Sequence, residues 1–188
     1  MLLSLLSTAA LLSLNSGGAR TPGDTSTSAR AASPTITHTP VVGIKSHMVA
    51  DSIVVEKSKH TLTLYEMGMP VHVYQVALGP QPTGDKVRMG DGRTPEGLYR
   101  IDYKNAQSKY HMALHISYPD AAHLQRANAL GVEAGGDIMI HGLPPAYKSI
   151  GAEQAKYDWT EGCIAVTDQE IEQIWAAVPQ GVPIQIKP

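Results

Sequence analysis

The chain has 188 residues, of which 43% are hydrophobic and 17% are charged, and its formal net charge is −2. A chain of this length holds one ordinary domain and a tail, because domains cluster at roughly 100 to 150 residues. The composition is typical of a globular protein, and without a basic excess to neutralise a phosphate backbone we expect no nucleic-acid partner.

The chain begins with an apolar run that is too short to cross a bilayer of about 30 Å as a helix. Small residues follow it, and Gly17 and Ala19 suit a signal peptidase, although no Lys or Arg precedes the run. We predict that residues 1–19 are a signal peptide or an N-terminal membrane anchor, and the alternative is an apolar tail without a targeting role. The protein is therefore expected in the periplasm or cell envelope.

A polar segment follows the apolar run. Residues 20–40 are dominated by Ser, Thr, Ala and Pro. They offer too little apolar surface to offset the entropy of ordering, and so predict a disordered linker. The predicted catalytic domain then covers residues 41–188.

The domain opens with short β-rich runs. Residues 53–56 and 61–65 are separated by a polar stretch at 57–60, which predicts a hairpin. Residues 71–78 carry apolar side chains on both faces, which is typical of a central strand. Further strands are expected at residues 97–103, 112–117, 137–140 and 182–187.

Two segments predict helices, at residues 121–130 and 167–178. In the second, Thr167 is placed to cap the helix, Glu170 occupies the third position of a capping box, and the apolar residues form one stripe. Many short strands and one late helix predict a mostly β fold with helical decoration, arranged as a β-sandwich or a barrel-like domain.

The chemistry centres on one thiol. Cys163 is the only cysteine, so it forms no internal disulfide. A free thiol is a liability in an oxidising compartment, which favours a chemical role over that of a small buried hydrophobe. With a pKa of about 8.5 the thiol needs a neighbouring base, and an imidazole can take the proton and return it. His141, at the end of an apolar strand, is the best candidate, and Gly162 lets backbone approach a bound carbonyl.

These residues lie in ordered segments that resemble the L,D-transpeptidase catalytic domain, also called the YkuD family. A strand that ends in His141-Gly142 is followed by a loop and then by Thr160-Glu161-Gly162-Cys163-Ile164, which is similar to the family's Ser/Thr-x-Gly-Cys motif. Residues 90–99 look like the family's Thr-Pro-x-Gly start of a strand, and residues 181–184 resemble its ending. The resemblance spans about residues 51–187 and implies the family's fold.

Two positions depart from the family pattern. Glu161 stands where many members carry His, and Ala165 stands where Arg is frequent. The loop at residues 143–159 is also long, which bears on the choice of donor substrate. By resemblance the chain looks closest to a murein transpeptidase-like branch that includes hydrolases of peptidoglycan crosslinks or of lipoprotein attachments.

The resemblance implies a role for each site residue. Cys163 would attack the carbonyl between a meso-diaminopimelate and the terminal D-Ala of a stem tetrapeptide, forming a thioester. His141 would act as base and then as acid, with the carbonyl of Gly142 orienting its ring. The amides of Gly162 and Cys163 would hold the oxyanion, and Thr160 would support the loop. An amine from a neighbouring stem would then give a crosslink between third residues or attach a protein.

Two other activities stay open. Water in place of the amine would make the protein an L,D-carboxypeptidase or amidase that hydrolyses stem peptides or lipoprotein–peptidoglycan links. A peptidoglycan-binding module without turnover is the other alternative, and the presence of both Cys163 and His141 favours catalysis over it. In every case the expected partner is the peptidoglycan stem peptide. The protein is then expected to act in cell-wall biogenesis or degradation and to affect cell shape.

The remaining candidates carry weaker signals. His111 and His115 are four residues apart and could join His141 at a zinc ion, but their segment looks like a strand, where such residues lie about 13 Å apart. We therefore expect neither a metal nor a cofactor. His115 could line the cleft, Arg93 could meet carboxylates of a stem peptide, and Trp159 could form a substrate platform.

Overall fold

The computed structural model describes residues 48–188. The predicted signal segment, the predicted linker and the first residues of the predicted domain lie outside the described residues, so these predictions stay untested. Within 48–188, no helix combines the length and the hydropathy that a membrane span requires.

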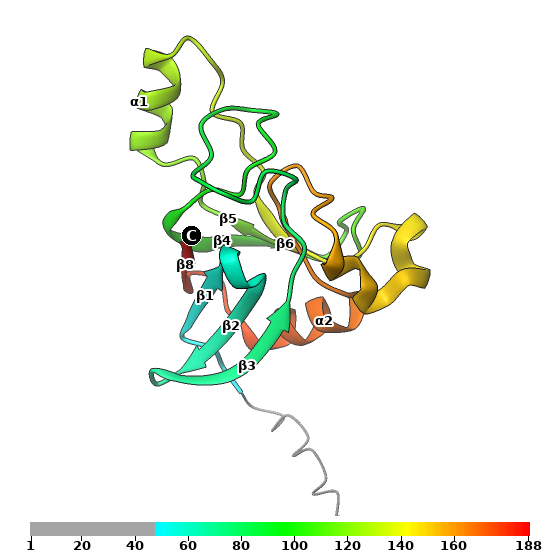
Figure 1. The fold of residues 1–188 in the computed structure, drawn as a ribbon. Helices are drawn as coiled ribbons and strands as arrows, with labels where there is room; N and C mark the ends of the chain where they lie inside the picture. Colours follow the sequence, from blue (N-terminus) through cyan, green and yellow to red (C-terminus); the bar gives the residue numbers. More distant parts are fainter. Residues whose placement is uncertain (1–47) are drawn as a thin grey trace, which may run out of the picture. The chain divides into compact units, whose positions relative to one another are not determined.

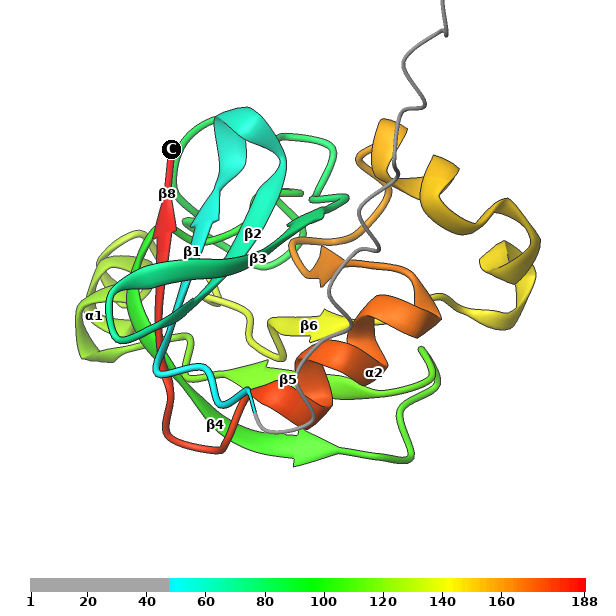
Figure 2. The ribbon, with the colours of Figure 1, turned by 90° about the horizontal axis from the view of Figure 1, so that it is seen from below.

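The described residues form one mixed sheet of eight strands in the order β3-β2-β1-β8-β4-β5-β6-β7, and the sheet curls upon itself (Figures 1 and 2). All neighbours pair antiparallel except β1 with β8 and β6 with β7, which are parallel. The expected mostly β, barrel-like fold with helical decoration is therefore confirmed. The strands are β1 (Ser52–Glu56), β2 (Thr61–Glu66), β3 (Met69–Gln75), β4 (Gly97–Asn105), β5 (Ala113–Ile116), β6 (Met139–His141), β7 (Ile164–Ala165) and β8 (Pro183–Lys187).

The predicted hairpin forms, but the strand that follows it lies elsewhere than expected. A single 3-10 turn, η1 (Lys57–Lys59), joins β1 to β2. β3 is an edge strand, so the prediction of a central strand was wrong. Val71 and Val73 are exposed on β3, whereas Val76 and Leu78 are buried. The apolar run therefore combines an edge strand with a following segment that enters the core, where Ala77 pairs with Ala165 of β7.

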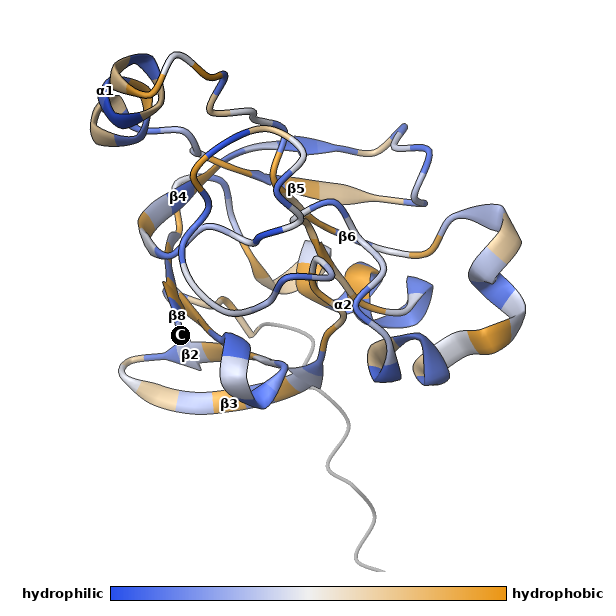
Figure 3. Cartoon of the chain, turned by 45° about the horizontal axis from the view of Figure 1, so that its top comes forward, coloured by the Kyte–Doolittle hydropathy of each residue, from blue (hydrophilic) through white to orange (hydrophobic). Residues whose placement is uncertain are grey.

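Both predicted helices form, as α1 (Ala121–Ala129) and α2 (Asp168–Ala177). The predicted capping box is present: the Thr167 hydroxyl accepts a hydrogen bond from the Glu170 amide, and the Glu170 carboxylate accepts one from the Thr167 amide. Buried Ile171 and Ile174 join α2 to the core, and α2 packs against β5 and β6. Figure 3 shows apolar residues concentrated along these three elements. This packing gives β6 a rigid support.

One helical segment was missed. The loop between β6 and β7 contains η2 (Pro145–Lys156), a 3-10 segment that is broken at Gly151, where φ is +50°. Among its residues only Gln154 is buried, so the sequence carries no apolar stripe that could have revealed it.

Candidate active site

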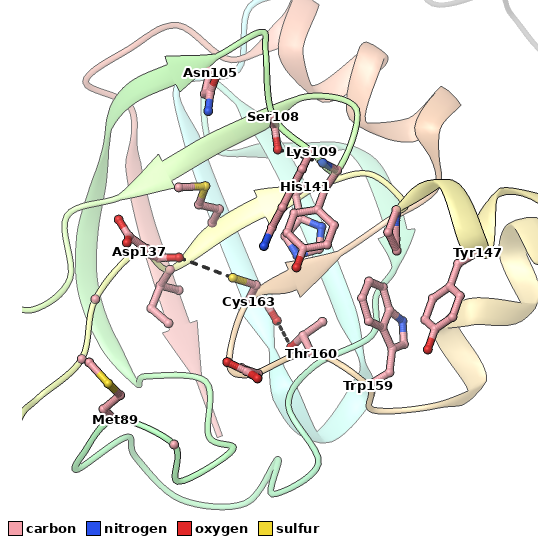
Figure 4. Close-up of a pocket in the computed structure, with 18 of the residues that line it drawn as sticks. Met89, Asn105, Ser108, Lys109, Asp137, His141, Tyr147, Trp159, Thr160 and Cys163 are labelled. Carbon is pink, nitrogen blue, oxygen red and sulfur yellow. Dashed lines mark hydrogen bonds between the residues drawn. The ribbon is translucent and has the colours of Figure 1, made fainter.

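A cavity of about 1020 Å³ opens beside β6 and β7 (Figure 4). Four of the predicted site residues line it together, although they come from separate parts of the sequence. The walls are completed by the β4–β5 hairpin, by η2 and by the loop that precedes β6. The four residues are His141, Trp159, Thr160 and Cys163.

The register of β6 and β7 places the nucleophile and base candidates on one face of the sheet. These parallel strands pair Ile140 with Ile164, and both side chains are fully buried in the core. Because successive strand side chains alternate between faces, His141 and Cys163, one residue away from this pair, project to the opposite face. Two short strands and the packed core therefore fix both groups.

His141, the base candidate, is held by a backbone hydrogen bond. Its side chain is 2% exposed, and its Nδ1 lies 2.7 Å from the carbonyl oxygen of Gly142. A carbonyl only accepts hydrogen bonds, so Nδ1 carries the proton and Nε2 has a free lone pair. The Tyr110 ring stacks on the imidazole at 4.4 Å between centroids. Burial lowers the pKa of His141, the positive charge of Lys109 lowers it further, and the Gly142 bond opposes them.

The space around position 142 admits only glycine. A Cβ at this position would lie 2.8 Å from Oδ1 of Asp168 and 3.0 Å from the carbonyl oxygen of Tyr110. The same Asp168 oxygen accepts a hydrogen bond of 2.8 Å from the amide of Leu143. The first residue of α2 thus anchors the chain just after the base.

The Cys163 thiol is a protonated group at rest. Its Sγ donates to the carbonyl oxygen of Asp137 at 3.5 Å, drawn as a dashed line in Figure 4. Burial raises the pKa of Cys163, and the charges of Asp137 and Glu161 add to the rise. A hydrogen bond from the Met139 amide and the charge of Lys86 oppose it.

The turn before the nucleophile is closed by Thr160. Its hydroxyl donates to the carbonyl oxygen of Cys163 at 2.8 Å and accepts from the amide of Gly162 at 3.2 Å. Of the two amides implied for the oxyanion, that of Gly162 therefore already has an acceptor. Cys163 itself lines the cavity, which leaves its amide as the candidate donor.

The same turn rests on a loop from an earlier part of the chain. Gly162 has a φ of +123°, and a Cβ there would lie 2.5 Å from the carbonyl oxygen of Arg93. A Cβ on Gly79 would lie 2.2 Å from the carbonyl oxygen of Gly92. Arg93 therefore supports the turn through its backbone, its guanidinium donates to the carbonyl of Asp85 at 3.2 Å, and it does not line the cavity.

His115 also lies outside the cavity lining. Its Nδ1 is 2.6 Å from Oδ1 of Asp102, and its ring stacks on Tyr103 with centroids 4.3 Å apart. His111 pairs instead with Glu172 at 2.7 Å. Across residues 48–188 no group of three His, Cys, Asp or Glu side chains is arranged to hold a metal ion.

Trp159 stands in the cavity wall and is fixed by η2. Its Nε1 donates to the Gln154 side chain at 3.0 Å, and the Tyr147 ring meets it edge-on at 5.0 Å. The Gln154 amide in turn donates to the carbonyl oxygen of Ala165 in β7 at 3.2 Å. One buried glutamine thus ties the aromatic wall to the strand that follows the nucleophile.

Several cavity residues were missed by sequence reasoning, and most of them lie in loops. The clearest available signal was Gly135-Gly136, a turn before the strand predicted at residues 137–140. Asp137 was expected to begin that strand, but it has a φ of +53° and precedes β6. The buried Lys86 forms an ion pair of 2.8 Å with Asp91, and no local pattern marks it. The missed cavity residues with polar or aromatic side chains are Lys86, Asn105, Gln107, Ser108, Lys109, Tyr110, Asp137 and Tyr147.

Comparison with known proteins identifies one family over most of these residues. The model of the L,D-transpeptidase catalytic domain, YkuD, matches residues 50–186. YafK of Escherichia coli K12, described as a candidate L,D-transpeptidase, is 33% identical over 128 residues, which make up 65% of this chain and 44% of YafK. The chain thus spans less than half the length of this curated relative.

Solved structures share the fold. The helical cell shape determining protein Pgp2 of Campylobacter jejuni matches with a TM-score of 0.55 and 23% identity, over 74% of this chain and 48% of Pgp2. Bd1075 of Bdellovibrio bacteriovorus matches with a TM-score of 0.53 and 21% identity, over 74% of this chain and 48% of Bd1075.

Proposed function

The chain belongs to the L,D-transpeptidase catalytic domain family, and on this premise we propose that it is a cysteine-dependent L,D-transpeptidase of peptidoglycan stem peptides. The observation that carries the proposal is a neutral imidazole in the same cavity as the only thiol of the chain. The Gly142 carbonyl fixes the proton on Nδ1 of His141, which leaves Nε2 as the base for Cys163.

The first half-reaction forms a thioester. As Sγ of Cys163 bonds to the carbonyl carbon before the terminal D-Ala, its proton moves to Nε2 of His141. The carbonyl oxygen becomes an oxyanion, for which the Cys163 amide is the candidate donor. The carbon–nitrogen bond then breaks, and the imidazolium returns the proton to the leaving amine of D-Ala. The nucleophile, base and donor all come from the chain, so the proposed chemistry uses neither metal nor cofactor.

The second half-reaction transfers the acyl group to an amine. The amine nitrogen bonds to the thioester carbon as His141 takes its proton, the carbon–sulfur bond breaks, and the imidazolium returns the proton to Sγ of Cys163. The acidic side chains Asp137 and Glu161 border the cavity and would attract a cationic acceptor. The cavity volume is at the upper end of the range for single ligands, about 300 to 1000 Å³, which leaves room for a second peptide. These two features support transpeptidation over hydrolysis.

The test uses the purified protein with a disaccharide tetrapeptide, analysed by mass spectrometry. Intact protein should gain the mass of the disaccharide-tripeptide acyl group, and Cys163→Ala should not. The expected product is a dimer of two stems that has lost one D-Ala. A shortened monomer as the sole product would instead assign an L,D-carboxypeptidase. Binding without an adduct or a product would assign a peptidoglycan-binding module.

The proposal also places the protein at the cell wall. Stem peptides lie outside the cytoplasmic membrane, so the function requires export to the periplasm or cell envelope. The expected phenotype of loss is a change in cell-wall crosslinking or cell shape, which muropeptide analysis and microscopy of a Cys163→Ala strain would measure.

A further inference from the structure

A second histidine lies next to the nucleophile without lining the cavity. His115 on β5 is 11% exposed and has a carboxylate at each ring nitrogen. Asp102 of β4 lies 2.6 Å from Nδ1, and Asp137 lies 3.9 Å from Nε2. The ring also stacks on Tyr103 with an interplanar angle of 15°. Strand contacts therefore fix the imidazole and leave one nitrogen directed at Asp137.

Asp137 needs such a contact because its own conformation is unfavourable. Its φ of +53° lies in the left-handed region, which costs energy for a residue with a side chain. The side chain is 88% exposed, so packing does not hold it. In residues 48–188, His115 is the basic side chain within 4.0 Å of this carboxylate. At 3.9 Å the contact is too long for a hydrogen bond, and the imidazole acts on the carboxylate through electrostatic attraction.

The backbone of Asp137 touches the nucleophile. Its carbonyl oxygen accepts the Sγ hydrogen bond of Cys163 at 3.5 Å. A hydrogen bond to the neutral form of an acid favours that form, so this contact stabilises the thiol over the thiolate. It also directs the thiol proton to Asp137, whereas attack requires the proton to reach Nε2 of His141.

We propose that His115 is a positioning residue which, by bridging Asp102 and Asp137, holds the Asp137 carbonyl against Cys163 and keeps the nucleophile protonated between turnovers. The inference rests on the proposed function, because it takes Cys163 as the nucleophile. Substrate binding then has to release the thiol towards His141. Since the thiolate is the form that oxidants attack, the contact protects the only cysteine of the chain at rest.

The test is the alkylation rate of Cys163 by iodoacetamide at fixed pH, followed by intact mass. Labelling is specific because the chain has no other cysteine. His115→Gln should raise the rate about fivefold, the factor for loss of one hydrogen bond. The increase should shrink in 1 M NaCl, since the 3.9 Å attraction between His115 and the exposed Asp137 carboxylate is screened at that ionic strength.

Two further variants keep the result interpretable. Asp137→Asn removes the carboxylate and keeps a residue type that tolerates positive φ, so it should give the same increase, with no further gain in the double variant. His123→Gln is the matched control: its side chain is 10% exposed, and Asp120 and Asp85 lie 2.6 Å and 3.6 Å from its ring nitrogens. The alkylation rate of Cys163 in this control should stay within about twofold of the parental rate. The control loses a comparable histidine–carboxylate pairing, but at a place that does not contact Asp137.

An unchanged or slower rate in folded His115→Gln overturns the inference. An increase in His115→Gln that Asp137→Asn does not reproduce also overturns it, because the effect would then bypass Asp137. Alkylation does not depend on turnover. A protein that shows these rates but forms no acyl adduct would therefore contradict the proposed function and not the thiol contact.

Discussion

The two walls of the cavity are held by different kinds of contact. The inner wall carries Cys163 and His141 on β6 and β7, and it rests on buried isoleucines and on backbone that approaches the glycine at 162. The outer wall consists of η2 and Trp159, joined by side chains such as Gln154 and the 38% exposed Tyr147.

The two walls differ in the substitutions that they can tolerate. Backbone that packs against a glycine has no room for a Cβ, whereas an exposed aromatic side chain can change size without disturbing the core. A rigid inner wall suits groups that must keep their geometry during proton transfer, and an adjustable outer wall suits substrate selection. Four predictions test this division, from the largest expected effect to the smallest.

The sharpest test of the inner wall is removal of the base. His141→Gln should lower kcat for acyl transfer by about 10²- to 10⁴-fold, the usual contribution of a general base. The control is His72→Gln on β3, which lies outside the cavity lining and should keep parental turnover. A His141→Gln protein that retained more than about a tenth of parental kcat would contradict the assigned base.

The second test compares two glycines with positive φ. Gly162→Ala places a Cβ 2.5 Å from the Arg93 carbonyl oxygen, whereas Gly68, with a φ of +75°, has nothing within 4 Å of the added atom. We expect Gly68→Ala to lower the free energy of unfolding by about 1 kcal/mol and Gly162→Ala by about 3 kcal/mol or more. Urea unfolding measures both. Equal losses would show that backbone strain alone, and not the close packing, limits the inner wall.

The inner wall was also the part that could be predicted from the sequence. His141-Gly142 and Gly162-Cys163 are contiguous motifs, and the capping box of α2 needs only residues 167 and 170. Such local signals survive in any fold that uses them. The sheet order did not follow in the same way, because β3 carries apolar residues on both faces and still lies at the edge.

The outer wall and the loops around the cavity could not be predicted, because no local pattern marks their contacts. Trp159 was singled out from its place before the nucleophile, but its partner Gln154 carries no pattern. Asp137 and Lys86 reach the cavity from loops whose sequences show only turns. Arg93 was expected at the substrate and supports the turn at Gly162 through its backbone instead. Positions of this kind depend on tertiary packing, which local propensity does not specify.

A substitution in the outer wall is expected to have a smaller effect on the kinetics. Tyr147 lines the cavity and contacts Trp159, so Tyr147→Ala should raise KM by about threefold to tenfold and leave kcat near the parental value. Tyr157→Ala is the matched control, because this 67% exposed tyrosine follows η2 and does not line the cavity. Steady-state kinetics with the tetrapeptide measure both. A fall in kcat without a change in KM would place Tyr147 with the inner wall.

The smallest effect concerns the charge that faces the base. Burial, and then the charge of Lys109, lower the pKa of His141 below its ordinary 6.5. The imidazole therefore stays neutral to lower pH, and kcat/KM should fall only as the pH drops through this lowered pKa. The lowered pKa of His141 also makes the folded state more stable relative to the unfolded chain above pH 6.5, and this stability is lost as the pH falls.

Lys109→Met removes the cation, so the pKa of His141 should rise and the acid limb of kcat/KM should move to higher pH. The shift should shrink in 1 M NaCl. A limb that moves to lower pH would show that Lys109 acts on the substrate and not on the base.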